Sequence, residues 1–314
     1  QCKTHNIFDF YVCKNKKRMQ EFWFKRLFLL LQIAVVAVFL GRAWQHLYWD
    51  APYRVLLWDE DWMRPIVQGI FGWQWEDYVT SMPIDRGIQN FIRATGGYYI
   101  VAALAAIFIN KWKKIAVIIL WIGAVSLIML ALLYCKDKFY HIGQFLEYTL
   151  QWSSPLFLIW LYRRQAVGPQ FLIWMKIAIA LTFVCHGLYA IGYYPRPGEF
   201  LEMSMVILNI NEAGALLFLQ IVGILDFVGS ILLFLPAKIS RVALWYLAFW
   251  GLVTTFARVL APFQLGISID TILLQHLHES IYRMPHFLVP LALVIAAKVS
   301  TYSNRQDIGN PQQV

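Results

Sequence analysis

The sequence predicts an all-α fold: a polytopic membrane helical bundle of about eight transmembrane helices in two tandem four-helix repeats, with an interfacial helical insertion after the first span. Two observations predict the fold class. Of the 314 residues, 60% are hydrophobic and 14% are charged, against about 45–50% and about 25% in soluble domains. Apolar stretches near the roughly 20 residues needed to cross a bilayer also recur along the chain. This composition excludes a disordered chain, a disulfide scaffold, a collagen-like repeat and an ordinary soluble enzyme.

Eight stretches are apolar enough to be membrane spans. They are 27–47, 96–110, 115–135, 140–161, 171–193, 213–236, 242–260 and 272–299. The second is long enough only if it begins near Ile88, and the fourth and eighth carry polar residues in their first halves. None alternates with the period of a barrel strand, and backbone polar groups cannot stay unpaired in lipid, so we expect helices.

The distribution of charge predicts the orientation in the membrane. The chain has 27 Lys and Arg against 18 Asp and Glu, a net charge of +9. Basic residues gather before the first span, after the second, fourth and sixth spans, and at the C-terminal end, whereas acidic residues gather in the other loops. The positive-inside rule therefore predicts that both termini are cytoplasmic and the acidic loops are outside. We expect a multi-pass protein of a bacterial-type inner (plasma) membrane. The positive charge thus faces the lipid bilayer and the cytoplasm, and we expect no nucleic-acid partner.

The chain divides into four segments. We expect a cytoplasmic N-terminal segment (1–26), a first four-helix unit (27–164), a second four-helix unit (165–300) and a cytoplasmic tail (301–314). Residues 114–121 and 238–245 both run from Lys-Ile to Leu-Trp, and His46 and His186 both lie near the outer end of the first span of their unit. Such matches in the same order predict a tandem repeat, with both units in the same orientation because four spans is an even number.

Two motifs in the second unit resemble a known family. Residues 186–192 read His-Gly-Leu-Tyr-Ala-Ile-Gly, and residues 223–233 place Asp226 among glycines. Both are similar to DoxX-like membrane proteins, over roughly residues 171–299. The insertion at 49–95 shows a looser similarity to the membrane domain of carboxylase-like proteins. DoxX-like proteins are typically single four-helix units without such an insertion. The resemblance implies a helical bundle associated with quinone-linked or thiol redox chemistry.

Ionisable residues gather near the outer ends of the spans. On the eighth span, four of them are spaced as on one helical face, and others follow on the fourth and fifth spans. Such groups are costly at membrane depth unless they are paired or face a cavity. The candidate ligand-binding residues are His141, Glu147, His186, His276, Glu279, Arg283 and His286.

Three interpretations of these residues remain open. The first is a metal site with His276, Glu279 and His286 as ligands, although the spacing is His-x-x-Glu rather than the Glu-x-x-His of di-metal bundles. The second is a pocket for a quinone or similar small molecule, in which a few polar groups converge within apolar walls. The third is a set of interhelical polar contacts, worth about 0.6 kcal/mol each.

Asp226 lies in the middle of an apolar span and must be protonated, paired or exposed to water there. It is therefore either a proton-relay group or a carboxyl hydrogen-bonded to a neighbouring helix, with Arg258 as a candidate partner.

The insertion 49–95 mixes tryptophans with acidic residues. This pattern predicts one or two amphipathic helices lying in the membrane interface, as a lid over the bundle or as a docking surface for a partner.

No motif for covalent catalysis or nucleotide binding is present in the sequence. It contains no phosphate-binding glycine loop, serine nucleophile elbow, HExxH or haem CxxCH. The four cysteines, Cys2, Cys13, Cys135 and Cys185, form no CxxC pair, and we expect no disulfide. The resemblance to DoxX-like proteins, together with the polar residues near the outer face, implies an accessory redox protein that binds a quinone or similar molecule at a His-rich site near the outer face. The alternative is a non-catalytic subunit of a larger membrane complex, docked to other membrane subunits through the aromatic outer segment.

Overall fold

The computed structural model describes the backbone of residues 7–307 and the side chains of residues 18–300, and every regular element in that part of the chain is a helix. Six of the described helical segments are long and apolar enough to cross a membrane, which indicates a multi-pass membrane protein. They are α1 (Ile7–Tyr48), α6 (Ile109–Asp137), α9 (Pro169–Ile191), α11 (Glu212–Leu232), α12 (Ala237–Gln264) and the stretch formed by α14 (Leu277–Arg283) and α15 (Pro285–Asp307).

Two further expected spans form helices that are less apolar or shorter. α5 (Met82–Ile107) is long, but its first half carries Asp85, Arg86 and Arg93. The fourth expected span is divided at Tyr148 into α7 (Ile142–Glu147) and α8 (Thr149–Arg164). The 16 residues of α8 extend about 24 Å at 1.5 Å per residue, less than the roughly 30 Å of a hydrocarbon core.

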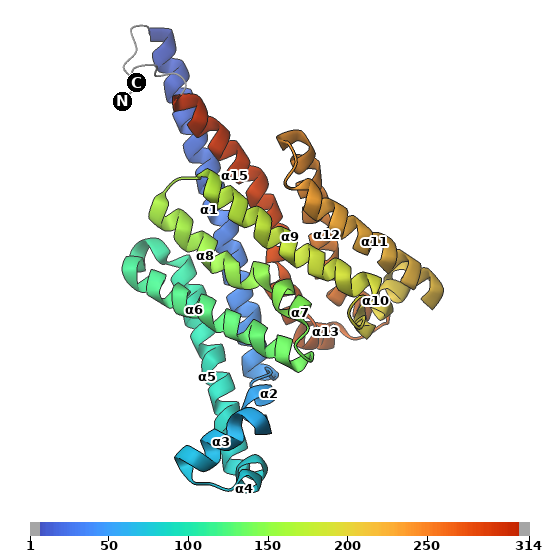
Figure 1. Cartoon of the computed structure of the whole chain (residues 1–314). Helices are drawn as coiled ribbons and strands as arrows, with labels where there is room; N and C mark the ends of the chain where they lie inside the picture. The colour runs from blue at the N-terminus through green and yellow to red at the C-terminus, as the bar shows by residue number, and fades with distance from the viewer. Residues whose placement is uncertain (1–6, 308–314) are drawn as a thin grey trace.

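The helices pack into one bundle in which α1 and α9 each contact several others (Figure 1). α1 contacts α5, α8, α14 and α15, while α9 contacts α7, α8, α11 and α15. The start of α1 and the end of α15 lie at the same end of the molecule (Figure 1). α10 (Gly198–Leu208) lies against α11 and α12, and α13 (Ile269–Gln275) lies against α12 and α14. Helices far apart in the sequence are therefore neighbours in the bundle.

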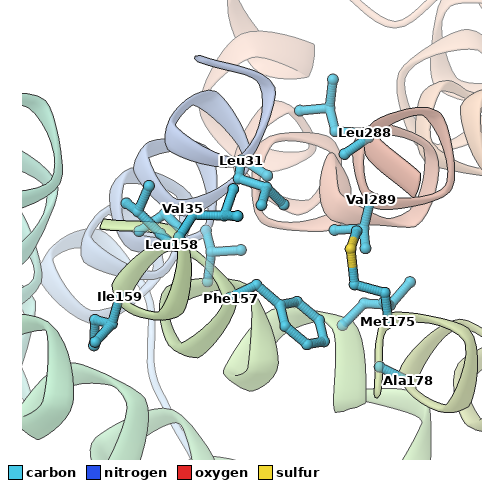
Figure 2. Packing of buried hydrophobic residues seen from close by; sticks show 14 of the residues in the cluster. Leu31, Val35, Phe157, Leu158, Ile159, Met175, Ala178, Leu288 and Val289 are labelled. Atoms are coloured by element: carbon cyan, nitrogen blue, oxygen red, sulfur yellow. The ribbon is translucent and has the colours of Figure 1, made fainter. Parts of the chain in front are cut away.

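The main apolar core lies where both sequence halves meet. Figure 2 shows Leu31 and Val35 of α1 with Phe157 and Leu158 of α8, beside residues of α9 and α15 such as Met175 and Val289. Because lipid tails are as apolar as these side chains, close van der Waals packing rather than the hydrophobic effect holds such helices together.

Glycines allow the closest helix contacts. A Cβ atom at Gly41 of α1 would lie 2.6 Å from the backbone N of Tyr282 in α14, and one at Gly251 of α12 would overlap the carbonyl oxygen of His286 in α15. A Cβ at Gly187 of α9 would lie 2.8 Å from the carbonyl oxygen of Gly223 in α11. Small residues at such crossings bring the backbones into contact.

The insertion after α1 forms three short helices beside the start of α5: α2 (Arg54–Leu57), α3 (Glu60–Phe71) and α4 (Trp75–Thr80). Asp59 caps α3 by accepting a hydrogen bond from the Trp62 backbone N–H at 2.9 Å. Gly72 ends α3 with a left-handed φ of 68°, which glycine adopts without strain. Val67, Trp75 and Tyr78 form a small core of their own.

Candidate functional site

A buried carboxylate, Glu147, lies at the centre of the polar residues within the bundle. Its Oε1 is 3.2 Å from His186 Nε2 of α9 and 3.3 Å from Arg283 Nη1 of α14. The ring of His286, on α15, lies 5.4 Å from that of His186, measured between centroids. The structure therefore brings together four of the seven candidate residues, from four helices. We call Glu147, His186, Arg283 and His286 the Glu147 cluster.

Local breaks in the helices position this cluster. Glu147 is the last residue of α7, directly before the break at Tyr148. Pro285 has no N–H to donate to the carbonyl of Ile281, which accepts instead from the Met284 N–H at 3.2 Å, so α14 ends there and α15 begins. His286 Nδ1 lies 2.8 Å from the carbonyl oxygen of Arg283. A carbonyl can only accept, so Nδ1 carries the proton and Nε2 of the neutral ring is an acceptor.

An apolar cavity adjoins the cluster between α9, α10, α11 and α12. Its volume is about 120 Å³, and its walls include Phe200, Leu219 and Trp250. The few ionisable groups on its wall are His186 and Arg283 of the cluster, Arg258 and Asp226. Apolar walls with a few polar groups are typical of small-molecule sites.

Asp226 is buried on this wall at 2% exposure. Tyr246 and Trp250 lie beside its carboxyl, and its Oδ1 has no hydrogen-bond partner among the described residues. Arg258, its candidate partner, instead binds Glu199 Oε2 at 2.8 Å and Glu279 Oε2 at 2.5 Å. Asp226 and Arg258 thus share the cavity wall without forming an ion pair.

A second, larger hollow lies on the other side of Arg258. Its volume is about 600 Å³, and it is open to the surface, since Trp49 and Leu265 on its wall are 42% and 55% exposed. His276 and Glu279 line this hollow, which we call the vestibule. The two residues therefore lie apart from His286, with which they were expected to share one helical face.

The remaining candidate, His141, lies outside the Glu147 cluster. It precedes α7 and stacks on the ring of Tyr194, with 5.0 Å between centroids.

Among the described residues, no three His, Cys, Asp or Glu side chains are grouped so that they could hold a metal ion. Cys135 and Cys185 are free thiols, whereas Cys2 and the side chain of Cys13 lie outside the described part.

Arg42 is a buried cation on α1, and it has partners on several other helices. Arg42, 1% exposed, donates to Gln151 Oε1 and to Gln45 Oε1, each at 2.7 Å. Its guanidinium also lies 3.9 Å from the ring centroid of Tyr282, with Tyr134 and Tyr148 on other sides. In the sequence, the one signal for this polar environment is Tyr148 and Gln151, which are at helical spacing on the fourth expected span. Periodicity within one helix cannot pair Arg42 with Tyr134 of α6 or Tyr282 of α14.

No family model matches the chain, and no curated protein or solved structure matches it either. A functional proposal therefore depends on the geometry of the cavity and of the groups on its wall.

Proposed function

We propose that this protein is an inner-membrane accessory redox protein of DoxX-like type that binds a quinone, or a similar single-ring molecule, in the cavity beside the Glu147 cluster. The observation that carries this proposal is the composition of the cavity wall, which is apolar except for Ser204, Thr254 and a few ionisable groups. Such a wall favours a flat, uncharged ring with hydrogen-bonding oxygens over a charged ligand.

The size of the cavity supports a ligand with one ring. An engineered cavity of about 150 Å³ with apolar walls binds benzene, and the cavity here is about 120 Å³. A benzoquinone head fits this range, and an apolar tail attached to it would leave between helices towards lipid.

Hydrogen-bond donors on the wall match the carbonyl oxygens of a quinone. Arg283 Nε is buried and has no hydrogen-bond partner among the described residues, although Nη1 of the same group faces Glu147. The two arginines on this wall are bound elsewhere: Arg258 binds two glutamates and Arg283 faces Glu147, so neither forms an ion pair with Asp226. A carboxyl in such surroundings is more stable as the neutral acid, and in that form its O–H donates to a carbonyl.

The finer architecture of the proposal is two tandem four-helix units, with eight spans in total. Its support is a corresponding order of helix contacts: α1 with α5 and α9 with α11, α5 with α6 and α11 with α12, α6 with α7–α8 and α12 with α14–α15. The last element of each half also packs near the first, since α8 contacts α1 and α15 contacts α9. In this arrangement, both termini are cytoplasmic and the vestibule faces outward.

Filling the cavity tests the proposal directly. Val222 lines the cavity at 7% exposure, whereas Leu217 on the same helix is 58% exposed. We expect purified protein in nanodiscs to bind decylubiquinone, Val222→Phe to abolish binding, and the control Leu217→Phe to retain it. Tryptophan fluorescence quenching reports binding. Unchanged affinity in Val222→Phe, with its melting temperature preserved, would refute the site.

A second candidate function is a non-catalytic subunit that docks to other membrane subunits through the aromatic outer segment. The observation that favours it is the apolar surface of α3 and the loop after it, where Trp62, Ile70, Phe71 and Trp73 are 61%, 74%, 56% and 48% exposed. Extraction in a mild detergent followed by mass spectrometry tests it. A stoichiometric protein partner that is lost in Trp62→Ser supports docking, and its retention in that variant contradicts it.

A further inference from the structure

The vestibule carries an excess of negative charge. Its wall includes the carboxylates of Glu199, Glu202 and Glu279 but one guanidinium, that of Arg258, and no lysine. Arg258 binds Glu199 and Glu279, while Glu202, on the exposed side of α10, has no cationic partner among the described residues. Arg42 lies behind Gln45 of the same wall, and including its charge leaves one negative charge in excess. A ligand with a single positive charge complements this wall.

A buried histidine on the vestibule wall supplies a specific acceptor. His278 is 6% exposed, and its Nδ1 has no hydrogen-bond partner among the residues that the structure describes. A buried polar atom without a partner is uncommon and calls for a ligand or water. With the proton on Nε2, the neutral imidazole accepts a hydrogen bond at Nδ1.

An aromatic face completes the wall. Trp49 stacks on His278, with 6.4 Å between centroids and 20° between planes, and its Nε1 donates to the carbonyl of Leu274 at 3.2 Å. These contacts hold the indole at the vestibule. The face of a tryptophan attracts cations more strongly than that of any other side chain.

We propose that the vestibule is a binding site for a primary ammonium group, which donates to His278 Nδ1 and to the Glu202 carboxylate beside the face of Trp49. The chemistry is that of the headgroup of phosphatidylethanolamine or of a small free amine. An anion would be repelled by the glutamates, and a quaternary ammonium has no N–H for His278. The vestibule is a separate hollow from the cavity, although Arg258 lines both, and this proposal does not depend on the proposed quinone.

Native mass spectrometry of the full-length protein tests the lipid source. We expect retention of phosphatidylethanolamine over phosphatidylcholine and phosphatidylglycerol by about tenfold, as for one charge-assisted hydrogen bond. Glu202→Gln should remove most of this preference. The matched control is Glu212→Gln, an exposed glutamate on α11 that does not line the vestibule. Both positions are on the surface, so both variants are expected to fold, and their melting temperatures verify this.

Saturation-transfer NMR with ethanolamine tests the free amine. Binding of ethanolamine that weakens in Glu202→Gln and in His278→Phe assigns the site to free amines. Selective retention of phosphatidylethanolamine without ethanolamine binding assigns it to lipid. Equal retention of the three lipids together with no ethanolamine signal overturns the proposal, as does a Glu202→Gln variant that behaves like the parent in both experiments.

Discussion

Glu147 is an acid from the first half of the chain whose partners, His186 and Arg283, both come from the second half. Neither the carboxylate nor the guanidinium has lipid or bulk water within reach, because both are buried. The stability of such a pair depends on both members being present, since the loss of one leaves the other charge uncompensated.

We therefore expect Glu147→Gln to destabilise the protein by about 3–5 kcal/mol, because it leaves Arg283 buried without its carboxylate. The apolar double variant Glu147→Leu/Arg283→Met should lose much less, since it leaves no uncompensated charge. Unfolding in mixed micelles of increasing SDS content measures both. A double variant that loses at least as much stability as Glu147→Leu and Arg283→Met added together would contradict this account.

If Asp226 donates a hydrogen bond to the quinone, two substitutions of similar size should affect binding differently. We expect Asp226→Leu to weaken decylubiquinone binding by about 3–10-fold, the value of one hydrogen bond. Asp226→Asn should bind nearly as tightly as the parent, because its amide N–H also donates to a carbonyl. Titration in nanodiscs with tryptophan fluorescence distinguishes the two. Weaker binding in Asp226→Asn than in Asp226→Leu would show that the carboxyl does not act as a donor.

At the scale of elements, an ion pair at the start of α3 links this helix to α6 of the bundle. Lys136, at the end of α6, donates a hydrogen bond to Asp59, the N-cap of α3. This hydrogen bond, with that from the Trp62 N–H, lowers the pKa of the Asp59 carboxyl from its ordinary value of 3.8. A carboxyl whose pKa is lowered on folding stabilises the fold above its unfolded pKa, and this contribution is lost as pH falls through the lower folded value.

We therefore expect α3 to loosen as the pH is lowered below about 4, near the ordinary pKa of an aspartate. Amide hydrogen exchange of α3, corrected for its intrinsic pH dependence, measures this. Asp59→Asn should exchange quickly at neutral pH and lose the acid-dependent step, whereas Asp61→Asn, a neighbouring change, should behave like the parent. An acid-dependent step that persists in Asp59→Asn would assign it to another group.

At Gly251, α12 lies so close to α15 that there is no space for an additional methyl group. We expect Gly251→Ala to lower the melting temperature, because the new Cβ would overlap the carbonyl of His286. The control is Gly97→Ala in α5, where the new methyl group would have no neighbouring atom within 4 Å outside its own helix. That change should be neutral or stabilising by up to about 1 kcal/mol, since alanine favours a helix. A neutral Gly251→Ala would mean that the two helices can separate at no cost.

Most helices could be predicted from the sequence, and the reason is local. α9 was expected at 171–193 and extends over Pro169–Ile191, because a proline and a glycine mark the ends of its apolar stretch. The eighth span was less predictable. Helical periodicity assumes an unbroken helix, but breaks at His276 and Met284 separate α13, α14 and α15, so one expected polar face became two sites.

For the candidate site, the sequence indicated the ionisable residues but not the cavity beside them. Glu147, His186, Arg283 and His286 could be selected because ionisable residues in apolar spans are rare, and the structure places them together. The cavity beside them could not be predicted, since Phe200 and Trp250 on its wall are ordinary apolar residues of α10 and α12. Only their arrangement in three dimensions makes them a wall.

For the whole molecule, the two sequence halves are not independent bodies. α1 packs on α14 and α15, α8 packs on α9, and the main core contains residues of both halves (Figure 2). We expect residues 1–164 and 165–314 to be unstable when expressed separately and to copurify when expressed together, because their interface includes the partners of Glu147. Affinity capture through a tag on either half measures this. Two separately stable halves that do not associate would contradict it.

The environment of Arg42 has a consequence for the synthesis of the chain. Apart from Gln45, its partners Tyr134, Gln151 and Tyr282 lie on α6, α8 and α14. The helix that carries this guanidinium leaves the ribosome before the helices that carry these partners. A charged side chain within a membrane span is costly unless it is paired. Until α6, α8 and α14 have been made, Arg42 has only Gln45 of its own helix among these partners.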